Sequence, residues 1–373
     1  MKPTKRVAEL DGLRGLAILF VVLYHFRRPE GLLSSLWGPL GVGWIGVDLF
    51  FVLSGYLITG ILLDSVGQPY YYRKFIAARS LRIFPLYYAY LILCLTLTYL
   101  SSYHRPLLSV RQFCLYGAYL GNFDVARTSS WPAIDLLSPL WSLQIEEQFY
   151  LTLPFIVAYA TRKQLCVIFT GAVMLAFLVR LALWIAVPGN SIAAYVLMPC
   201  RMDALAIGGL IAIYKREQPE WFRSKWIPYG SLAATAGFAA ICFWQTASIK
   251  TPVMRTLGYS VLDLMFGGWL ATLIGGGQRH LAALCRWRPL VYLGTISYGV
   301  YLLHFPSARL AHYLASYVPN PSAHDAVRLW APLAVTILAA TMSWRFFESP
   351  ILKWRNRLRL FSGQAFARVG VLR

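Results

Sequence analysis

The sequence predicts an all-α, polytopic membrane protein with about ten transmembrane helices and both termini in the cytoplasm. Of its 373 residues, 58% are hydrophobic and only 13% are charged, which is far from the composition of ordinary globular proteins. Apolar runs of about 20 residues recur along the whole length, and a helix of that length crosses a hydrocarbon core of roughly 30 Å. The basic residues are distributed unevenly between these runs. A simple soluble enzyme is therefore excluded.

The apolar runs predict ten spans. In chain order they are residues 12–28, 43–63, 83–103, 139–159, 165–187, 193–213, 227–247, 255–275, 290–313 and 328–347. The start of the chain imitates a secretory signal peptide, because Lys2 and Arg6 precede the apolar residues 16–24. No small-x-small cleavage pattern follows, so the sequence predicts that this run is the first membrane helix.

The distribution of Lys and Arg predicts the orientation. With an even number of spans both tails lie on one side, and the segments of that side hold 22 of the 35 basic residues, against 9 in the opposite loops and 4 inside spans. The positive-inside rule places that side in the cytoplasm. The net charge of +20 is then explained by contact with membrane lipid, and no nucleic acid is expected as a partner because no single basic domain is present.

One domain is expected. Residues 1–350 form the membrane domain, in which the largest outer loop, residues 104–138, is predicted to pack as a short lid. Residues 351–373 are predicted to be a basic cytoplasmic tail, and no appended soluble domain is visible. The six cysteines and six histidines show no ligand spacing, so the sequence predicts no metal site.

Ionisable residues at membrane depth are candidates for function, because each costs about 2.5 to 3.5 kcal/mol on insertion scales. At 1.5 Å per residue, His25 lies roughly 16 Å closer to the outside than Arg14, in the same outer layer as Asp48, Glu146 and Glu147. A carboxylate bonded to an imidazole orients it as a base that activates a hydroxyl. His25 with one of these acids is therefore a candidate catalytic pair.

Structural explanations stay open beside the catalytic one. Buried polar ties between helices explain His25 alone equally well, but three acids without nearby interior cations favour function. A pairing of Arg201 with Asp263 is as plausible as a site role. Aromatic belts and core packing explain most membrane aromatics, although some residues are candidates to bind an acceptor. These are Trp141, Tyr150, Tyr298, Tyr301 and His304.

A basic cluster lies before the third span. It contains Arg73, Lys74, Arg79 and Arg82. Three-residue spacing puts Arg79 and Arg82 on one helix face, where two guanidinium groups can bind phosphate oxygens. Four basic residues in a cytoplasmic loop are nevertheless ordinary, so spacing alone favours membrane anchoring.

Several sequence blocks are similar to those of one family. LDGLRG at residues 10–15 followed by His25 looks like an Arg-x10-His signature, and GVDLFFVLSGY at 46–56 looks like a second-helix block. RSLRIFP at 79–85 resembles an Arg-x-x-Arg motif, and WSLQIEEQFY at 141–150 resembles a paired-glutamate block. ISYGVYLLH at 296–304 and FFESP at 346–350 complete the pattern. Together they resemble the acyltransferase 3 family of bacterial integral-membrane acyltransferases, which modify carbohydrates and glycosylated compounds.

The resemblance implies a function and a set of roles. Arg14 and His25 would be essential, with His25 as base or transient acyl carrier, supported by the acids of the outer layer. Arg79 and Arg82 would bind the acyl donor, acetyl-CoA in most members, and this overturns the anchoring interpretation of the basic cluster, Arg73 and Lys74 included. The expected enzyme is an O-acyltransferase of the bacterial inner membrane that moves an acetyl group from cytoplasmic acyl-CoA to a carbohydrate hydroxyl outside.

Alternatives remain at this stage. A transporter or flippase of a glycan would also have ten helices and buried charges, but no inverted repeat is visible. A glycan-binding scaffold without activity is a third interpretation. The acceptor, the acyl length, the use of an acyl-enzyme, a homodimer and a periplasmic partner that completes the transfer all stay open, since some family members carry an additional periplasmic domain.

Overall fold

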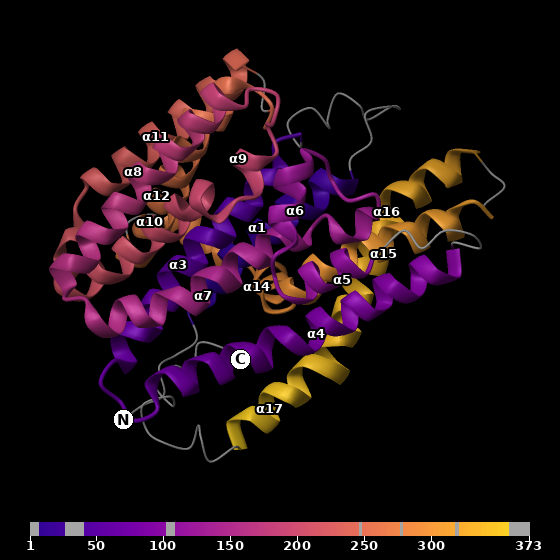
Figure 1. Cartoon of the computed structure of the whole chain (residues 1–373), viewed down its shortest axis with the longest axis horizontal. Coiled ribbons are helices and arrows are strands. Elements are labelled where there is room, and N and C mark those ends of the chain that lie inside the picture. The colour runs from indigo at the N-terminus through magenta and orange to yellow at the C-terminus, as the bar shows by residue number, and fades with distance from the viewer. Residues whose placement is uncertain are drawn as a thin grey trace.

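The computed structural model describes residues 7–26, 41–101, 109–245, 248–276, 279–317 and 321–357, and in this part of the chain the regular structure is helical throughout, with no strand. Figure 1 shows α8, α10, α11 and α12 gathered on one side of the molecule, α15 and α16 on the other, and α1 and α3 between them. The all-α prediction is therefore confirmed.

The helices follow the apolar runs. The long ones are α1 (Ala8–Phe26), α3 (Gly46–Ser65), α4 (Tyr71–Ser101), α7 (Leu140–Tyr159), α8 (Arg162–Ala186), α10 (Met198–Glu217), α11 (Trp226–Gln245), α12 (Tyr259–Gly275), α15 (Ser297–Ala315) and α16 (Pro321–Ser343). The shorter ones are α5 (Val110–Gly117), α6 (Gly121–Thr128), α9 (Ala193–Val196), α13 (Arg279–Cys285), α14 (Arg288–Thr295) and α17 (Ser349–Arg357). Single turns complete the set: η1 (Gly43–Ile45), η2 (Asp135–Leu137), η3 (Pro219–Arg223), η4 (Met254–Gly258) and η5 (Trp344–Glu348).

Six helical segments in the described ranges are long and apolar enough to cross a membrane. They are Gly43–Ser65, Tyr71–Leu100, Arg162–Ala186, Ala193–Glu217, Trp226–Trp244 and Met254–Gly275. Each of the ten predicted spans coincides with helix in its described residues. The remaining four spans are the ones that include α1, α7, α15 and α16, and α1 and α7 carry several of the charged candidate site residues. The structure thus supports a multi-pass membrane protein.

Two predicted boundaries differ from the observed helices. The third span was expected to start at residue 83, but α4 begins at Tyr71 and continues for 31 residues. Arg79 and Arg82 therefore lie inside a helix and not in a loop. The ninth span is divided, because α14 ends at Thr295 and α15 begins at Ser297.

Glycines allow the central helices to approach closely. A Cβ at Gly55 of α3 would overlap the backbone oxygen of Leu205 in α10, and a Cβ at Gly208 of α10 would overlap that of Val52 in α3. Helix pairs in membranes use such small residues because association depends on close van der Waals packing. This contact joins α3 to α10.

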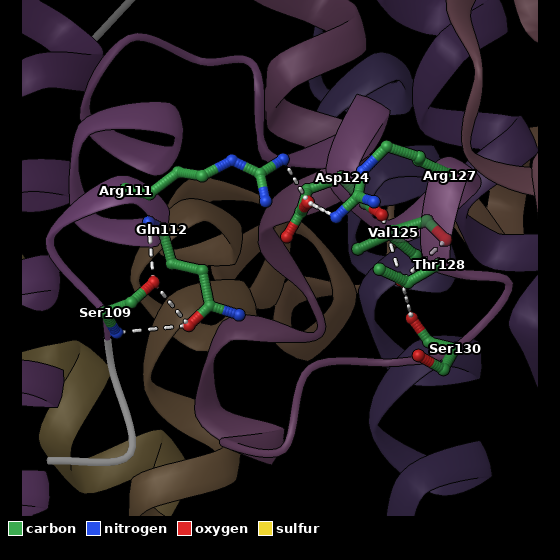
Figure 2. Close-up of polar contacts among 8 residues, drawn as sticks. All are labelled: Ser109, Arg111, Gln112, Asp124, Val125, Arg127, Thr128 and Ser130. Carbon is green, nitrogen blue, oxygen red and sulfur yellow. Dashed lines mark hydrogen bonds and ion pairs between the residues drawn. The ribbon is translucent and has the colours of Figure 1, made fainter.

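The segment between α4 and α7 is folded onto the bundle. In Figure 2 the guanidinium groups of Arg111 and Arg127 approach one oxygen of Asp124, at 2.8 and 3.1 Å, and Ser109 and Gln112 form a capping box at the start of α5. On the inner side, Gln144 and Gln148 of α7 bond to the segment near Asn122. The expected packing of residues 104–138 is thus found for residues 109–138, and residues 104–108 lie outside the described part.

Candidate active site

A cavity opens between α1, α3, α4, α7 and α15, with a volume of about 820 Å³ that includes its open part. Its polar wall consists of Arg14, Ser54, Arg79, Arg82, Ser142, Glu146, Tyr150, Ser297, Tyr298 and Tyr301. Its apolar wall consists of Val47, Phe50, Phe51, Leu53, Leu57, Ile58, Ile83 and Leu143.

The cavity is elongated along α3. Its lining extends on this helix from Val47 to Ile58, and eleven residues of α-helix rise about 16 Å. The motifs that were separate in the sequence therefore meet around one long cavity.

Three guanidinium groups line the cavity. Arg79 is only 7% exposed and its guanidinium lies 5.5 Å from the ring centre of Tyr150. Its Nη2 atom has no hydrogen-bond partner among the described residues. Arg14 of α1 and Arg82 of α4 act on each other electrostatically across the cavity. Because a buried guanidinium needs partners for its donors, the arrangement fits an anionic ligand such as a phosphate.

Glu146 lies among these cations. Its carboxylate accepts a hydrogen bond of 3.2 Å from the Tyr150 hydroxyl, and that hydroxyl is 2.6 Å from Ser54 Oγ. Arg14 and Arg79 also act on Glu146 electrostatically. Sequence arithmetic put Glu146 level with His25, but helix packing puts it level with Arg14. A depth counted from the start of each helix does not include the tilt and offset of packed helices.

Hydrogen bonds between hydroxyl groups connect α7 and α15 at the part of the cavity wall near Tyr301. Ser142 Oγ of α7 lies 2.5 Å from the Tyr301 hydroxyl of α15, which also donates to the backbone oxygen of Pro139 over 2.8 Å. The ring of Phe50 lies 6.5 Å from that of Tyr301. These contacts fix α7 against α15 beside the cavity.

His25 and His304 lie beyond this wall. His304 follows Tyr301 by one helical turn of α15 and is completely buried. The ring centres of His25 and His304 are 4.9 Å apart, and Phe305 contacts both rings. Neither histidine is among the residues that line the cavity. The structure thus brings the two histidines together next to the Tyr301 part of the cavity.

Asp48 belongs to a different cluster. Its carboxylate forms an ion pair with Arg201, and both side chains are completely buried. Arg180 pairs with Asp203 at 2.8 Å in the same region. The guanidinium of Arg201 also lies 4.0 Å above the ring of Tyr259. Arg201 is therefore the ion-pair partner of Asp48, and not of Asp263 as the sequence pattern suggests.

The other predicted residues lie around the cavity. Tyr298 lines it and donates to the backbone oxygen of Ile83 at 2.7 Å. Glu147 is buried on α7 outside the lining, and Trp141 packs on Tyr195 with ring centres 4.5 Å apart. Arg73 and Lys74 precede Arg79 by more than one turn, also outside the lining.

Three polar cavity residues, Ser54, Ser142 and Ser297, were absent from the predicted site. Ser54 and Ser142 are single hydroxyls inside apolar helices. A serine in a membrane helix usually bonds to its own backbone, so the sequence offers no sign that these two reach across to Tyr150 and Tyr301. Their position inside two of the recognised blocks was the available signal.

The sequence pattern of a known acyltransferase domain matches residues 7–347 of the chain. The chain belongs to this acyltransferase family. The match contains every residue of the cavity and both histidines. The arginine-lined cavity therefore lies within the part of the chain that matches the acyltransferase domain.

Curated relatives of this acyltransferase are similar over nearly the whole chain. A putative peptidoglycan O-acetyltransferase of Bacillus subtilis is 32% identical over 96% of the chain and 57% of its own length. A peptidoglycan O-acetyltransferase of Listeria monocytogenes is 30% identical over 94% of the chain and 56% of its own length. An O-acetyltransferase of Staphylococcus aureus is 27% identical. The chain thus spans little more than half the length of these relatives. A comparison with solved structures found no match.

Proposed function

We propose that the chain transfers an acetyl group from acetyl-CoA to a hydroxyl of a carbohydrate acceptor, as a membrane O-acetyltransferase. The observation that supports this most strongly is the cavity itself. It joins three arginines to a long, partly apolar passage. The relatives are named as O-acetyltransferases, one of them as a peptidoglycan O-acetyltransferase and another as a putative one. A glycan of the cell surface is therefore the acceptor we propose.

The donor would bind with its phosphates at the arginines. Arg79 and Arg82 project from successive turns of α4, and Arg14 faces them from α1. Guanidinium groups bind phosphate oxygens in pairs of charge-assisted hydrogen bonds. The apolar wall formed by Phe50 and Leu57 suits the thin pantetheine arm. Arg73 and Lys74 would add positive charge at the entrance.

The thioester would then lie near Tyr301, beside the two histidines. His25 would act as the base that removes the proton of the acceptor hydroxyl. The hydroxyl oxygen forms the new ester bond to the acetyl carbon, the carbon–sulfur bond breaks, and the proton leaves on the thiol. Glu146 and Tyr150 would keep the passage polar, and Trp141, Tyr298 and Glu147 would support its walls. Asp48 would act only through the packing of α3.

We also propose the orientation. Ten helices, α1, α3, α4, α7, α8, α10, α11, α12, α15 and α16, would cross the bacterial inner membrane with both tails in the cytoplasm. The excess of Lys and Arg on that side supports it. The donor would then enter from the cytoplasm and the acceptor from outside.

An activity measurement tests the function. Purified protein in lipid nanodiscs would be given acetyl-CoA and peptidoglycan fragments, while thiol release and the mass of the fragments are followed. We expect acetylated glycan from the native protein and a loss of about 10²- to 10⁴-fold in kcat for His25→Ala, as for other general bases. His280→Gln, on the exposed helix α13, is the control and should keep full activity.

The outcomes separate the assignments. Thiol release without acetylated glycan would retain the donor assignment and overturn the acceptor. A native protein that neither consumes acetyl-CoA nor modifies the glycan would overturn the enzymatic proposal.

A further inference from the structure

One ring nitrogen of His304 is buried without a hydrogen-bond partner among the described residues. The side chain is completely buried, and its Nδ1 lies 2.6 Å from the backbone oxygen of Tyr301. Because a carbonyl oxygen only accepts, Nδ1 carries the hydrogen, and Nε2 of the neutral ring carries a lone pair. This Nε2 has no hydrogen-bond partner among the residues that the structure describes. A buried nitrogen acceptor without a partner destabilises the folded protein and therefore requires an explanation.

His25 has the same tautomer when neutral. Its Nδ1 lies 2.8 Å from the backbone oxygen of Val21, so this nitrogen again is the donor. Nε2 is therefore the nitrogen of His25 that can take up a proton. The two ring centres are 4.9 Å apart with 52° between the planes, a separation at which nitrogens at the facing ring edges can approach hydrogen-bond distance.

His25 is the titratable side chain that influences the protonation of His304. The influences on the protonation of His304 are its burial, the charge of His25, and backbone hydrogen bonds at Tyr301 and Val300. Aromatic rings of α1 and α15 flank the pair, with the ring centre of Tyr24 5.1 Å from that of His25 and the ring centre of Phe305 4.7 Å from that of His304. His25 itself is exposed. Of the acids predicted to assist His25, Asp48 is ion-paired with Arg201 and Glu146 is bonded by Tyr150.

We propose that His304 is the positioning partner of His25 and accepts a hydrogen bond from Nε2–H of protonated His25, so that the two imidazoles share one proton. The pairing itself stands on the contacts of the two rings, and its catalytic meaning rests on the proposed acetyl transfer. His304 thus takes the role of the hydrogen-bond partner that orients His25, which the sequence pattern assigns to a carboxylate. It is not a catalytic residue in the strict sense, because it acts through His25.

His25 Nε2 takes the proton from the acceptor hydroxyl while the hydroxyl oxygen bonds to the acetyl carbon and the carbon–sulfur bond breaks. The electron pair of that bond leaves on sulfur as thiolate. The proton is held between His25 and His304 until it passes to the thiolate, which restores both neutral rings. No oxidant, reductant or metal is required.

Nitrogen NMR tests the pairing without relying on activity. Protein labelled with ¹⁵N-histidine would be titrated in detergent micelles, and the two rings would be assigned with His25→Asn and His304→Gln. We expect both rings to carry their hydrogen on Nδ1 at high pH. As the pH falls, the Nε2 signals of both rings should move together with uptake of one proton. In His304→Gln, His25 should become protonated only at a lower pH. The control His280→Gln should change neither signal.

Kinetics provide the second measurement. His304→Gln should lower kcat about tenfold or more while the KM for acetyl-CoA stays within about twofold, since the donor binds at the distant arginines. If His304→Gln lowers kcat without lowering thermal stability, the effect comes from the positioning of His25 and not from impaired folding. Independent titration of the two rings, a hydrogen on Nε2 of His304 at high pH, or an unchanged His25 in His304→Gln would overturn the pairing. Coupled titration in a protein without acyl transfer would retain the pairing and overturn the proposed function.

Discussion

Tyr150 shows how one side chain connects the polar groups of the site. Its hydroxyl donates to Glu146 and bonds to Ser54, while its ring lies beneath the guanidinium of Arg79. It therefore joins α3, α4 and α7 at the point where the cavity is most polar. A phenol ring keeps its shape when the hydroxyl is removed, so this contact can be tested without disturbing the packing.

We predict that Tyr150→Phe lowers the turnover of acetyl transfer. A hydrogen bond to a charged group contributes about 1.5 to 3 kcal/mol, which corresponds to at least about tenfold in rate. Steady-state kinetics measure it. Tyr71→Phe is the matched control, because that hydroxyl donates to the backbone oxygen of Pro154 and neither residue lines the cavity. Turnover within twofold of native in Tyr150→Phe would contradict a role for the contact.

We also predict a large loss of stability when the pair of Asp48 and Arg201 is broken. Arg201→Met leaves a buried carboxylate without its counter-ion, which costs about 3 to 5 kcal/mol. The double variant Asp48→Leu, Arg201→Met should recover part of this loss, because no unpaired charge remains. Thermal unfolding in detergent measures both. Arg223→Gln, which removes an exposed ion pair, should change stability by less than about 1 kcal/mol. Equal unfolding temperatures for Arg201→Met and native protein would contradict the structural role.

At the scale of elements, the sequence predicts helix positions well and contacts poorly. The apolar runs locate nearly every long helix, since run length directly reflects membrane thickness. The start of α4 was missed because its first three turns carry basic residues that look like a loop. The pairing of Asp48 with Arg201 joins residues 153 positions apart, and the approach of His25 to His304 likewise depends on how α1 and α15 pack. No local pattern encodes such contacts.

The contact between α3 and α10 provides a prediction at this scale. In Gly208→Leu the added side chain meets the backbone of α3 at Val52, so the helices must separate. We expect the free energy of unfolding to fall by about 1 to 3 kcal/mol, as for other overpacked cores. The yield of folded protein in size-exclusion chromatography should fall as well. Gly171→Leu, on an open face of α8 with nothing near the added atom, should behave like native protein. Equal yields from both variants would contradict close packing of α3 on α10.

At the scale of the whole molecule, the unequal distribution of basic residues predicts which face meets the cytoplasm. Cys114 is exposed on α5, which the proposed orientation places outside. A membrane-impermeant maleimide should label it on intact cells. In a Cys114→Ser background, Ser224→Cys, in the segment between η3 and α11, should be labelled only after the cells are opened. Labelling of Ser224→Cys on intact cells would reverse the orientation.

In the proposed mechanism the arginines of the cavity bind the acyl donor, and calorimetry of acetyl-CoA binding measures their contribution. The double variant Arg79→Gln, Arg82→Gln loses charge-assisted bonds of about 1.5 to 3 kcal/mol each, so we predict binding weaker by about 100-fold or more. The matched control Arg223→Gln, Lys225→Gln removes two exposed charges and should bind like native protein. Donor binding by the Arg79→Gln, Arg82→Gln protein within threefold of native would contradict this role of the arginines.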